Sequence, residues 1–161
     1  MANEIERKFL VKNTDWKHHT SGELFRQGYL NIDSERTVRV RIVGEKGFLT
    51  IKGKTKNITR AEYEYEIPVA DASNMLDTLC FGPQIQKIRY RVSFAGQTWE
   101  VDEFLGDNTG LIVAEIELDS EDQKIEFPEW IGEEVSNDPR YYNSNLTVLP
   151  FNQWQAPLSN N

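Results

Sequence analysis

Apolar and polar residues alternate along most of the chain, which is the pattern of β-strands that bury one face. The alternation runs through segments 4–10, 24–30, 37–42, 48–52, 61–69, 87–94, 97–104 and 110–118. Short turn sequences, Gly44 to Gly47 and Ala95-Gly96, separate neighbouring segments and predict hairpins. About eight regularly spaced strands indicate a mainly β (α+β) domain, built as a barrel or a sandwich.

Helical signals are few and short. Segment 71–79 predicts a helix with Asp71 as its N-cap, and segment 128–135 predicts a second one that begins at a proline. A third short helical piece is expected within 143–149. Residues 150–161 are rich in Asn, Gln and Pro and are expected to form an irregular C-terminal tail after a single domain of residues 1–149.

The polar positions of the predicted strands are almost all charged, and several rows carry one sign. Residues two apart share a face, so the rows gather the acids Glu4, Glu6, Glu62, Glu64, Glu66, Glu100, Asp102, Glu115 and Glu117 and the bases Lys8, Arg39, Arg41, Lys52, Lys54, Lys87, Arg89 and Arg91. Such rows repel internally unless a partner or ligand neutralises them. A closed barrel with a charged lumen explains them, and a sandwich with its charges in water is the alternative.

A lumen with both kinds of row would suit a metal-bound oligophosphate. Arg and Lys side chains donate charge-assisted hydrogen bonds to phosphate oxygens. Carboxylate pairs suit a hard divalent cation, which usually bridges to substrate phosphates. The sequence contains no Walker loop, so side chains rather than a glycine-rich backbone would hold the phosphates.

Composition narrows the class of partner. The chain has 161 residues with 18 Lys and Arg against 26 Asp and Glu, a net charge of −8, which disfavours nonspecific nucleic-acid binding. No apolar run approaches the roughly 18 residues of a membrane span, and the N-terminus lacks the apolar core of a signal peptide. The one cysteine, Cys80, suits a reducing compartment. We expect a cytoplasmic protein with a small-molecule partner, no nucleic acid and no membrane, as a monomer or homodimer.

Several motifs, in order, resemble the CYTH domain of the triphosphate tunnel metalloenzyme family. They are Glu4-Ile5-Glu6-Arg7-Lys8 (ExExK), Arg39-x-Arg41, Thr50-Ile51-Lys52-Gly53, Glu62-x-Glu64, Lys87-x-Arg89, Trp99-Glu100-Val101-Asp102, Ala114-Glu115-Ile116-Glu117-Leu118, Pro128-Glu129-Trp130-Ile131-Gly132-x-Glu134-Val135 and Tyr142-Asn143-x-x-Leu146. The likeness extends to about residue 149. It implies an eight-stranded antiparallel β-barrel tunnel with a charged lumen and a few short helices packed outside.

The resemblance also implies an activity, namely hydrolysis of a triphosphate with Mg²⁺ or Mn²⁺. The expected substrate is inorganic tripolyphosphate, cleaved to pyrophosphate and phosphate. The family also contains class IV adenylate cyclases and thiamine triphosphatases, so a cyclase, a thiamine or nucleoside triphosphatase and a non-catalytic polyphosphate-binding module remain alternatives.

Residue matching assigns three sets of roles within the tunnel. The implied metal ligands are Glu4, Glu6, Asp102, Glu115 and Glu117. The implied triphosphate contacts are Lys8, Arg39, Arg41, Lys52, Lys54, Lys87, Arg89 and Arg91. The implied catalytic groups are Lys52, Lys87, Glu62, Glu64 and Tyr29. The sequence does not choose the general base among Lys52, Lys87 and the glutamates, and Tyr29 matches a tyrosine near the substrate in some relatives.

Overall fold

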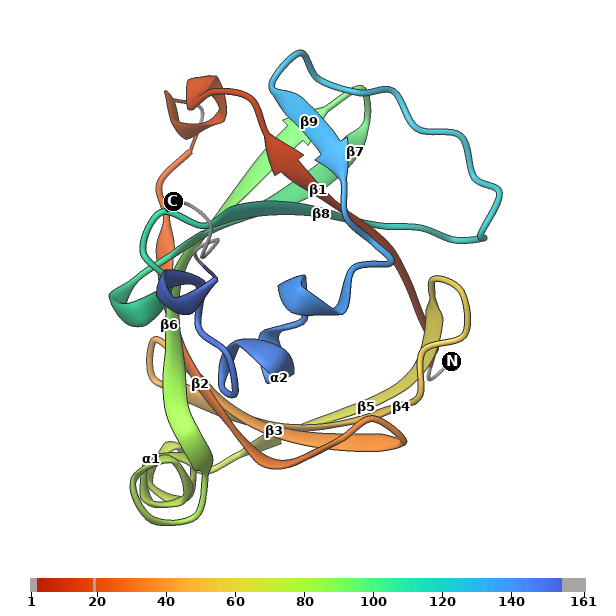
Figure 1. Cartoon of the computed structure of the whole chain (residues 1–161). Helices are drawn as coiled ribbons and strands as arrows, with labels where there is room; N and C mark the ends of the chain where they lie inside the picture. The colour runs from red at the N-terminus through yellow and green to blue at the C-terminus, as the bar shows by residue number, and fades with distance from the viewer. Residues whose placement is uncertain (1–2, 19, 155–161) are drawn as a thin grey trace, which may run out of the picture.

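The computed structural model describes residues 3–18 and 20–154 as a β-barrel with few helices (Figure 1). The strands are β1 (Asn3–Val11), β2 (Glu23–Asp33), β3 (Arg36–Val43), β4 (Lys46–Gly53), β5 (Thr59–Ile67), β6 (Phe81–Phe94), β7 (Gln97–Phe104), β8 (Ile112–Glu117) and β9 (Ile131–Glu134). The α-helices are α1 (Val69–Thr78) and α2 (Asn143–Leu146), and the 3₁₀ helices are η1 (Asp15–His18), η2 (Gly106–Asn108), η3 (Pro139–Tyr141) and η4 (Phe151–Gln153).

Eight of the strands close into an antiparallel barrel, as the resemblance implied, and the alternative of a sandwich is wrong. The order of neighbours is β5-β4-β3-β2-β6-β7-β8-β1, and β1 pairs with β5 to complete the ring. The closing contact is short, with Asn3 opposite Ala61 and Ile5 opposite Thr59. Closure separates an inner face from an outer one.

Segment 128–135 is not the predicted helix: its second half forms β9. The reason lies in β1, whose edge next to β5 is paired only at its beginning. Beyond that point β9 takes over this edge, with Val11 opposite Ile131, and the Val135 amide donates to the Lys8 carbonyl at 2.8 Å. Without β9 these β1 backbone groups would lack a strand partner. Gly132 fits the close approach, since a Cβ there would lie 3.1 Å from the Leu10 carbonyl oxygen.

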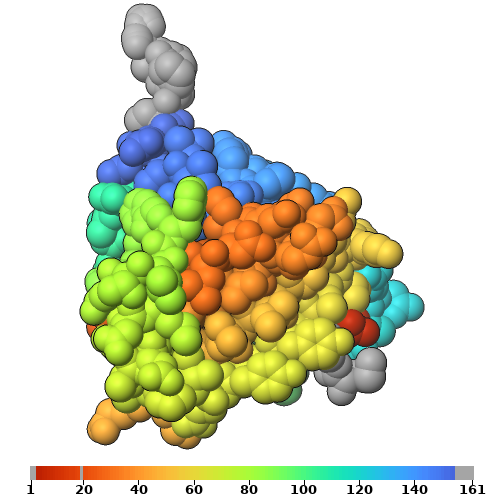
Figure 2. Space-filling model, turned by 90° about the horizontal axis from the view of Figure 1, so that it is seen from below, coloured from red at the N-terminus to blue at the C-terminus, as the bar shows by residue number. Residues whose placement is uncertain are grey.

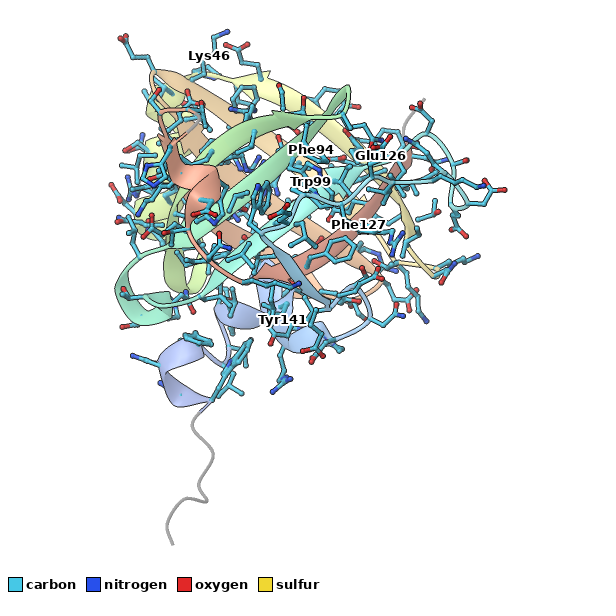
Figure 3. All side chains as sticks on the ribbon, turned by 90° about the horizontal axis from the view of Figure 1, so that it is seen from above. Lys46, Phe94, Trp99, Glu126, Phe127 and Tyr141 are labelled. Atoms are coloured by element: carbon cyan, nitrogen blue, oxygen red, sulfur yellow. The ribbon has the colours of Figure 1, made fainter. Side chains whose placement is uncertain are left out.

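Buried apolar side chains form three clusters rather than one central core. In the largest, the loop before β9 folds over the wall, and Phe127 lies beside Trp99 with their ring centroids 6.2 Å apart (Figure 3). A second cluster lies around Tyr141, at the end of the barrel opposite Lys46. Among the helices formed by residues 3–18 and 20–154, none is both long and apolar enough to span a bilayer.

Helix α1 covers the third cluster, on the outside of β3 and β4. Its buried residues Ala72 and Leu76 pack with Val40. The predicted cap is wrong, because the helix begins one turn earlier, after Pro68, and no side chain caps it. Asp71 instead lies in the first turn, where its charge favours the helix dipole.

Helix α1 leaves part of this wall uncovered. Figure 2 shows the side of the barrel formed by β2 to β5, with β4 and β5 side chains at the surface. Ile51, Tyr63 and Tyr65 face outward there and are 38%, 49% and 57% exposed. The outer face is therefore only partly protected by the chain's own helices.

Helix α2 lies within the ring of strands rather than outside it, which corrects the expected packing (Figure 1). Tyr142, Asn143 and Ser144 reach the lumen from this segment. The expected irregular tail begins with η4, after which Trp154 packs on Tyr141 with centroids 5.0 Å apart. Residues 155–161 of that tail lie outside the described part of the chain.

Leu76→Ala should reduce the free energy of unfolding by about 3 kcal/mol, because it removes the main apolar contact of α1 and leaves a cavity. Leu76 is 3% exposed, whereas Leu79, at the end of the same helix, is 63% exposed and supplies a matched control. Leu79→Ala should change the stability by less than about 0.5 kcal/mol. Denaturant unfolding measures both, and equal losses would contradict the role assigned to α1.

A charged tunnel as the candidate functional site

The inner face of the barrel encloses a cavity of about 370 Å³. This volume lies at the lower end of the range for small-molecule sites. Its lining contains most of the predicted site residues, namely Glu4, Glu6, Lys8, Tyr29, Arg39, Arg41, Lys52, Glu62, Glu64, Lys87, Arg89, Arg91, Glu115 and Glu117. The alternating rows therefore converge from all sides of the barrel onto one space.

Two predicted site residues do not line the cavity. The Lys54 side chain is 61% exposed and pairs with Glu35 outside. The prediction for Lys54 is corrected because β4 ends at Gly53, so the inward row stops at Lys52. Asp102 is only 1% exposed, but it lies in the wall behind the cations of β6.

Asp102 is the counterion of the β6 cations. It accepts hydrogen bonds from Arg89 Nε at 2.7 Å and Nη2 at 2.8 Å, and its Oδ2 lies 2.8 Å from Lys87 Nζ. Burial alone would raise the pKa of Asp102, but Arg89 and Lys87 lower it below its usual range. Both carboxylate oxygens are thus engaged, which gives Asp102 a different role from the predicted metal ligand.

The arginines of β3 have neutral partners instead. Arg39 donates to Thr50 Oγ1 at 3.2 Å, and its Nε is buried without a hydrogen-bond partner among the described residues. Arg41 Nε donates to Gln27 Oε1 at 2.9 Å. Within the part of the chain that the structure describes, neither guanidinium forms an ion pair. Their charge is therefore available to an anion in the lumen.

The acidic side of the cavity is only partly neutralised. Lys52 Nζ lies 3.1 Å from Glu4 Oε1, and Lys8 Nζ lies 3.4 Å from Glu115 Oε2. Burial, Glu115 and Glu4 together raise the pKa of Glu6 to about 8. Burial and the neighbours Glu4 and Glu62 also raise the pKa of Glu117. These carboxylates repel one another, so a cation among them would be favourable.

The donor set fits a hard divalent metal, although no metal cage is preformed. Carboxylate oxygens are the ligands that Mg²⁺ prefers. Among residues 3–18 and 20–154, no three Asp, Glu, His or Cys side chains are grouped closely enough to form a ready metal site. Two of the acids, Glu115 and Glu4, are instead paired with Lys8 and Lys52.

The segment from η3 to α2 contributes lumen contacts that the charge pattern did not predict. Lys8 Nζ donates to the Tyr141 carbonyl at 3.2 Å. Asn143 Oδ1 accepts from Lys87 Nζ at 3.1 Å and from Gln27 Nε2 at 2.9 Å. The only sequence signal was the motif that contains Asn143, and for Gln27 its position two residues before Tyr29 on the same strand face.

Comparisons with known proteins agree with this geometry. The pattern of the CYTH domain family matches residues 2–145. An inorganic triphosphatase from Acetivibrio thermocellus is 51% identical over 155 residues, covering 96% of this chain and 99% of the relative. An inorganic triphosphatase from Nitrosomonas europaea is 38% identical, covering 90% of this chain and 97% of the relative.

Solved structures share the fold. The crystal structure of an inorganic triphosphatase superimposes with a TM-score of 0.66 at 34% identity, covering 89% of this chain and 97% of the other. A putative adenylate cyclase from Bacillus halodurans has a TM-score of 0.60 at 18% identity, covering 75% of this chain and 84% of the other. The second likeness concerns the fold alone.

Asp102→Asn should reduce the free energy of unfolding by about 3 kcal/mol, because it leaves the buried cations Arg89 and Lys87 without their shared counterion. Asp77→Asn is the matched control, since Asp77 pairs with Arg26 at the same 2.7 Å but has a 58% exposed side chain. This exposed pair should contribute less than about 1 kcal/mol. Similar losses for both variants in denaturant unfolding would contradict the role of Asp102.

Proposed function

Since the chain belongs to the CYTH domain family, we propose that it hydrolyses inorganic tripolyphosphate to pyrophosphate and phosphate with the help of Mg²⁺ or Mn²⁺. The relatives named inorganic triphosphatase, which match the chain over nearly its whole length, support this substrate. They also support a hydrolase rather than a cyclase or a binding module.

The observation that carries the proposal is the separation of charge within one closed lumen. Among the described residues, Arg39 and Arg41 have no carboxylate partner, while Glu6 and Glu117 lack enough positive neighbours. A bound metal–oligophosphate complex supplies an anion to the first pair and a cation to the second. On a sheet face exposed to water, solvent would satisfy these charges and no bound ligand would be required.

The metal would be held by carboxylates that line the cavity: Glu4, Glu6, Glu115 and Glu117. When bound, a divalent cation neutralises phosphate oxygens and orients water for attack on phosphorus. Metal binding would also lower the repulsion among these carboxylates. Its presence is therefore favoured by the same charges that destabilise the free site.

The cationic side chains would hold the phosphates and stabilise charge on the leaving pyrophosphate. Lys8, Arg39, Arg41 and Arg89 reach the cavity from three different strands, so they can contact a chain of phosphates along its length. Burial, Arg89 and Arg41 lower the pKa of Lys87 to about 7, against the opposing effect of Asp102. Its Nζ is thus suited to exchange a proton during the reaction. Lys52 and the glutamates stay the other predicted bases.

Purified protein should convert tripolyphosphate to pyrophosphate and phosphate only when Mg²⁺ or Mn²⁺ is added, and EDTA should abolish the reaction. Ion chromatography of the products measures this, with ATP tested in parallel. Cyclic AMP and pyrophosphate from ATP would support the cyclase instead. Tight tripolyphosphate binding without turnover would support the binding module.

Glu117→Gln should lower the metal-dependent activity at least about tenfold, because it removes a proposed metal ligand. The melting temperature should not fall, since the carboxylate is repelled by its neighbours. Glu66→Gln is the matched control, because Glu66 belongs to the inward row of β5 but lies beyond the cavity lining and is exposed. Steady-state assays across Mg²⁺ concentrations test the pair. Full activity of Glu117→Gln would rule out the ligand assignment.

A further inference from the structure

An aromatic side chain of β2, Phe25, lies against the cations that line the lumen. Phe25 lies two residues before Gln27 on β2 and therefore on the same inner face as Gln27 and Tyr29. Its side chain is buried, with 2% exposure, yet it belongs to none of the three apolar clusters. Its burial comes from charged neighbours rather than from a hydrophobic core.

Cations gather around the Phe25 ring. The distances from its centroid are 4.8 Å to Arg41 Cζ, 4.9 Å to Arg89 Cζ, 5.9 Å to Lys87 Nζ and 6.0 Å to Arg91 Cζ. An aromatic face attracts a cation through its quadrupole, and the attraction is strongest where water is excluded. The ring thus holds like charges together that would otherwise repel.

Arg41 depends on this environment more than its neighbours do. Arg89 has Asp102 and Arg91 has Glu23 as anionic partners. For Arg41 the described residues supply only the Gln27 carbonyl oxygen at 2.9 Å and the Phe25 ring. Burial, Arg39 and Arg89 lower the pKa of Arg41 to about 9, which still leaves it charged at neutral pH.

Both polar atoms of the Gln27 side chain have hydrogen-bond partners. Its side chain is 0% exposed, its Oε1 accepts from Arg41, and its Nε2 donates to Asn143 Oδ1. The amide therefore fixes the direction of Arg41 without adding a charge. A carboxylate at this position would orient Arg41 equally well, but an incoming phosphate would then have to displace it.

We propose that Phe25 and Gln27 are positioning residues for the triphosphate: they hold Arg41 in the lumen with neutral groups, so that its whole charge meets a phosphate. This proposal rests on the proposed function, because it assumes that the lumen binds an oligophosphate. It assigns a binding role to two uncharged side chains in a site of charged residues.

Gln27→Glu separates positioning from mere structural support. The new carboxylate keeps the hydrogen bond to Arg41 and adds an ion pair, which offsets the lost donor to Asn143 Oδ1, so the melting temperature should change little. Asn143 keeps its hydrogen bond from Lys87. Tripolyphosphate should nevertheless bind about tenfold more weakly, as the Kd from metal-free calorimetry and as KM, with a smaller change in kcat. A purely structural Gln27 would give unchanged affinity in this variant, which would overturn the proposal.

Phe25 is tested by three variants measured together. Phe25→Leu removes the aromatic face and should raise KM about tenfold, whereas Phe25→Tyr retains the ring and should restore most of the affinity. Phe9→Leu is the matched control. Phe9 is 3% exposed and its ring centroid lies 5.2 Å from Arg7 Cζ, but it lies on the outer face. This variant should lower the melting temperature and leave KM unchanged.

The outcomes distinguish a failure of the proposed function from a failure of the positioning roles of Phe25 and Gln27. Wild-type protein that neither binds nor hydrolyses tripolyphosphate overturns the proposed function. Wild-type binding with equal affinity in Gln27→Glu and Phe25→Leu overturns only the positioning roles. Should Phe25→Leu fail to fold, Gln27→Glu decides the question alone.

Discussion

The pairing of β1 with β5 is the constraint on which the rest of the structure depends. Only a few residue pairs form this seam, yet they turn an open sheet into a ring and give every inward side chain the same enclosed space. Enclosure removes water from between the charges and so strengthens each attraction and repulsion. Once the ring is closed, every inward charge must find a partner inside the protein or await a ligand.

The chain meets this requirement differently on different walls. The β6 cations Arg89 and Lys87 share a buried carboxylate, Asp102 of the neighbouring strand β7, so part of their charge is compensated before any ligand arrives. On β3 the chain uses a hydroxyl, an amide and an aromatic ring, which leave the arginines charged. The acidic wall keeps an excess of carboxylates. The barrel is therefore stable without a ligand, although the charges in its lumen are only partly neutralised. A binding site for a charged ligand requires this.

The alternation of residues was sufficient to predict the strands and which side chains share a face, because side-chain direction in a strand has a period of two. It left a barrel and a sandwich open, and the resemblance to the CYTH domain decided for the closed barrel. The alternation could not predict that β9 would be a strand, since this depends on the unpaired edge of β1 and not on residues 128–135 themselves. The position of helix α2 could not be predicted for a similar reason. The helix was expected outside the barrel, but contacts of Asn143 with distant strands set its place in the lumen. Gln27 and Phe25 escaped notice because the pattern of charge marks only charged residues. Lys54 shared the alternation but lay just past the end of its strand.

The position of β1 also bears on how the chain reaches this structure. The strands β2 to β5 follow one another along the chain and pair in that order, as do β6 to β8. Each of these two sets of strands can therefore form from local contacts. β1 is different, because Lys8 pairs with Glu115 near the opposite end of the sequence. Such non-local pairing must overcome a large loop-closure entropy and slows folding. During synthesis β1 leaves the ribosome well before β8, and until β8 follows, the edge of β1 that pairs with it stays open to other chains.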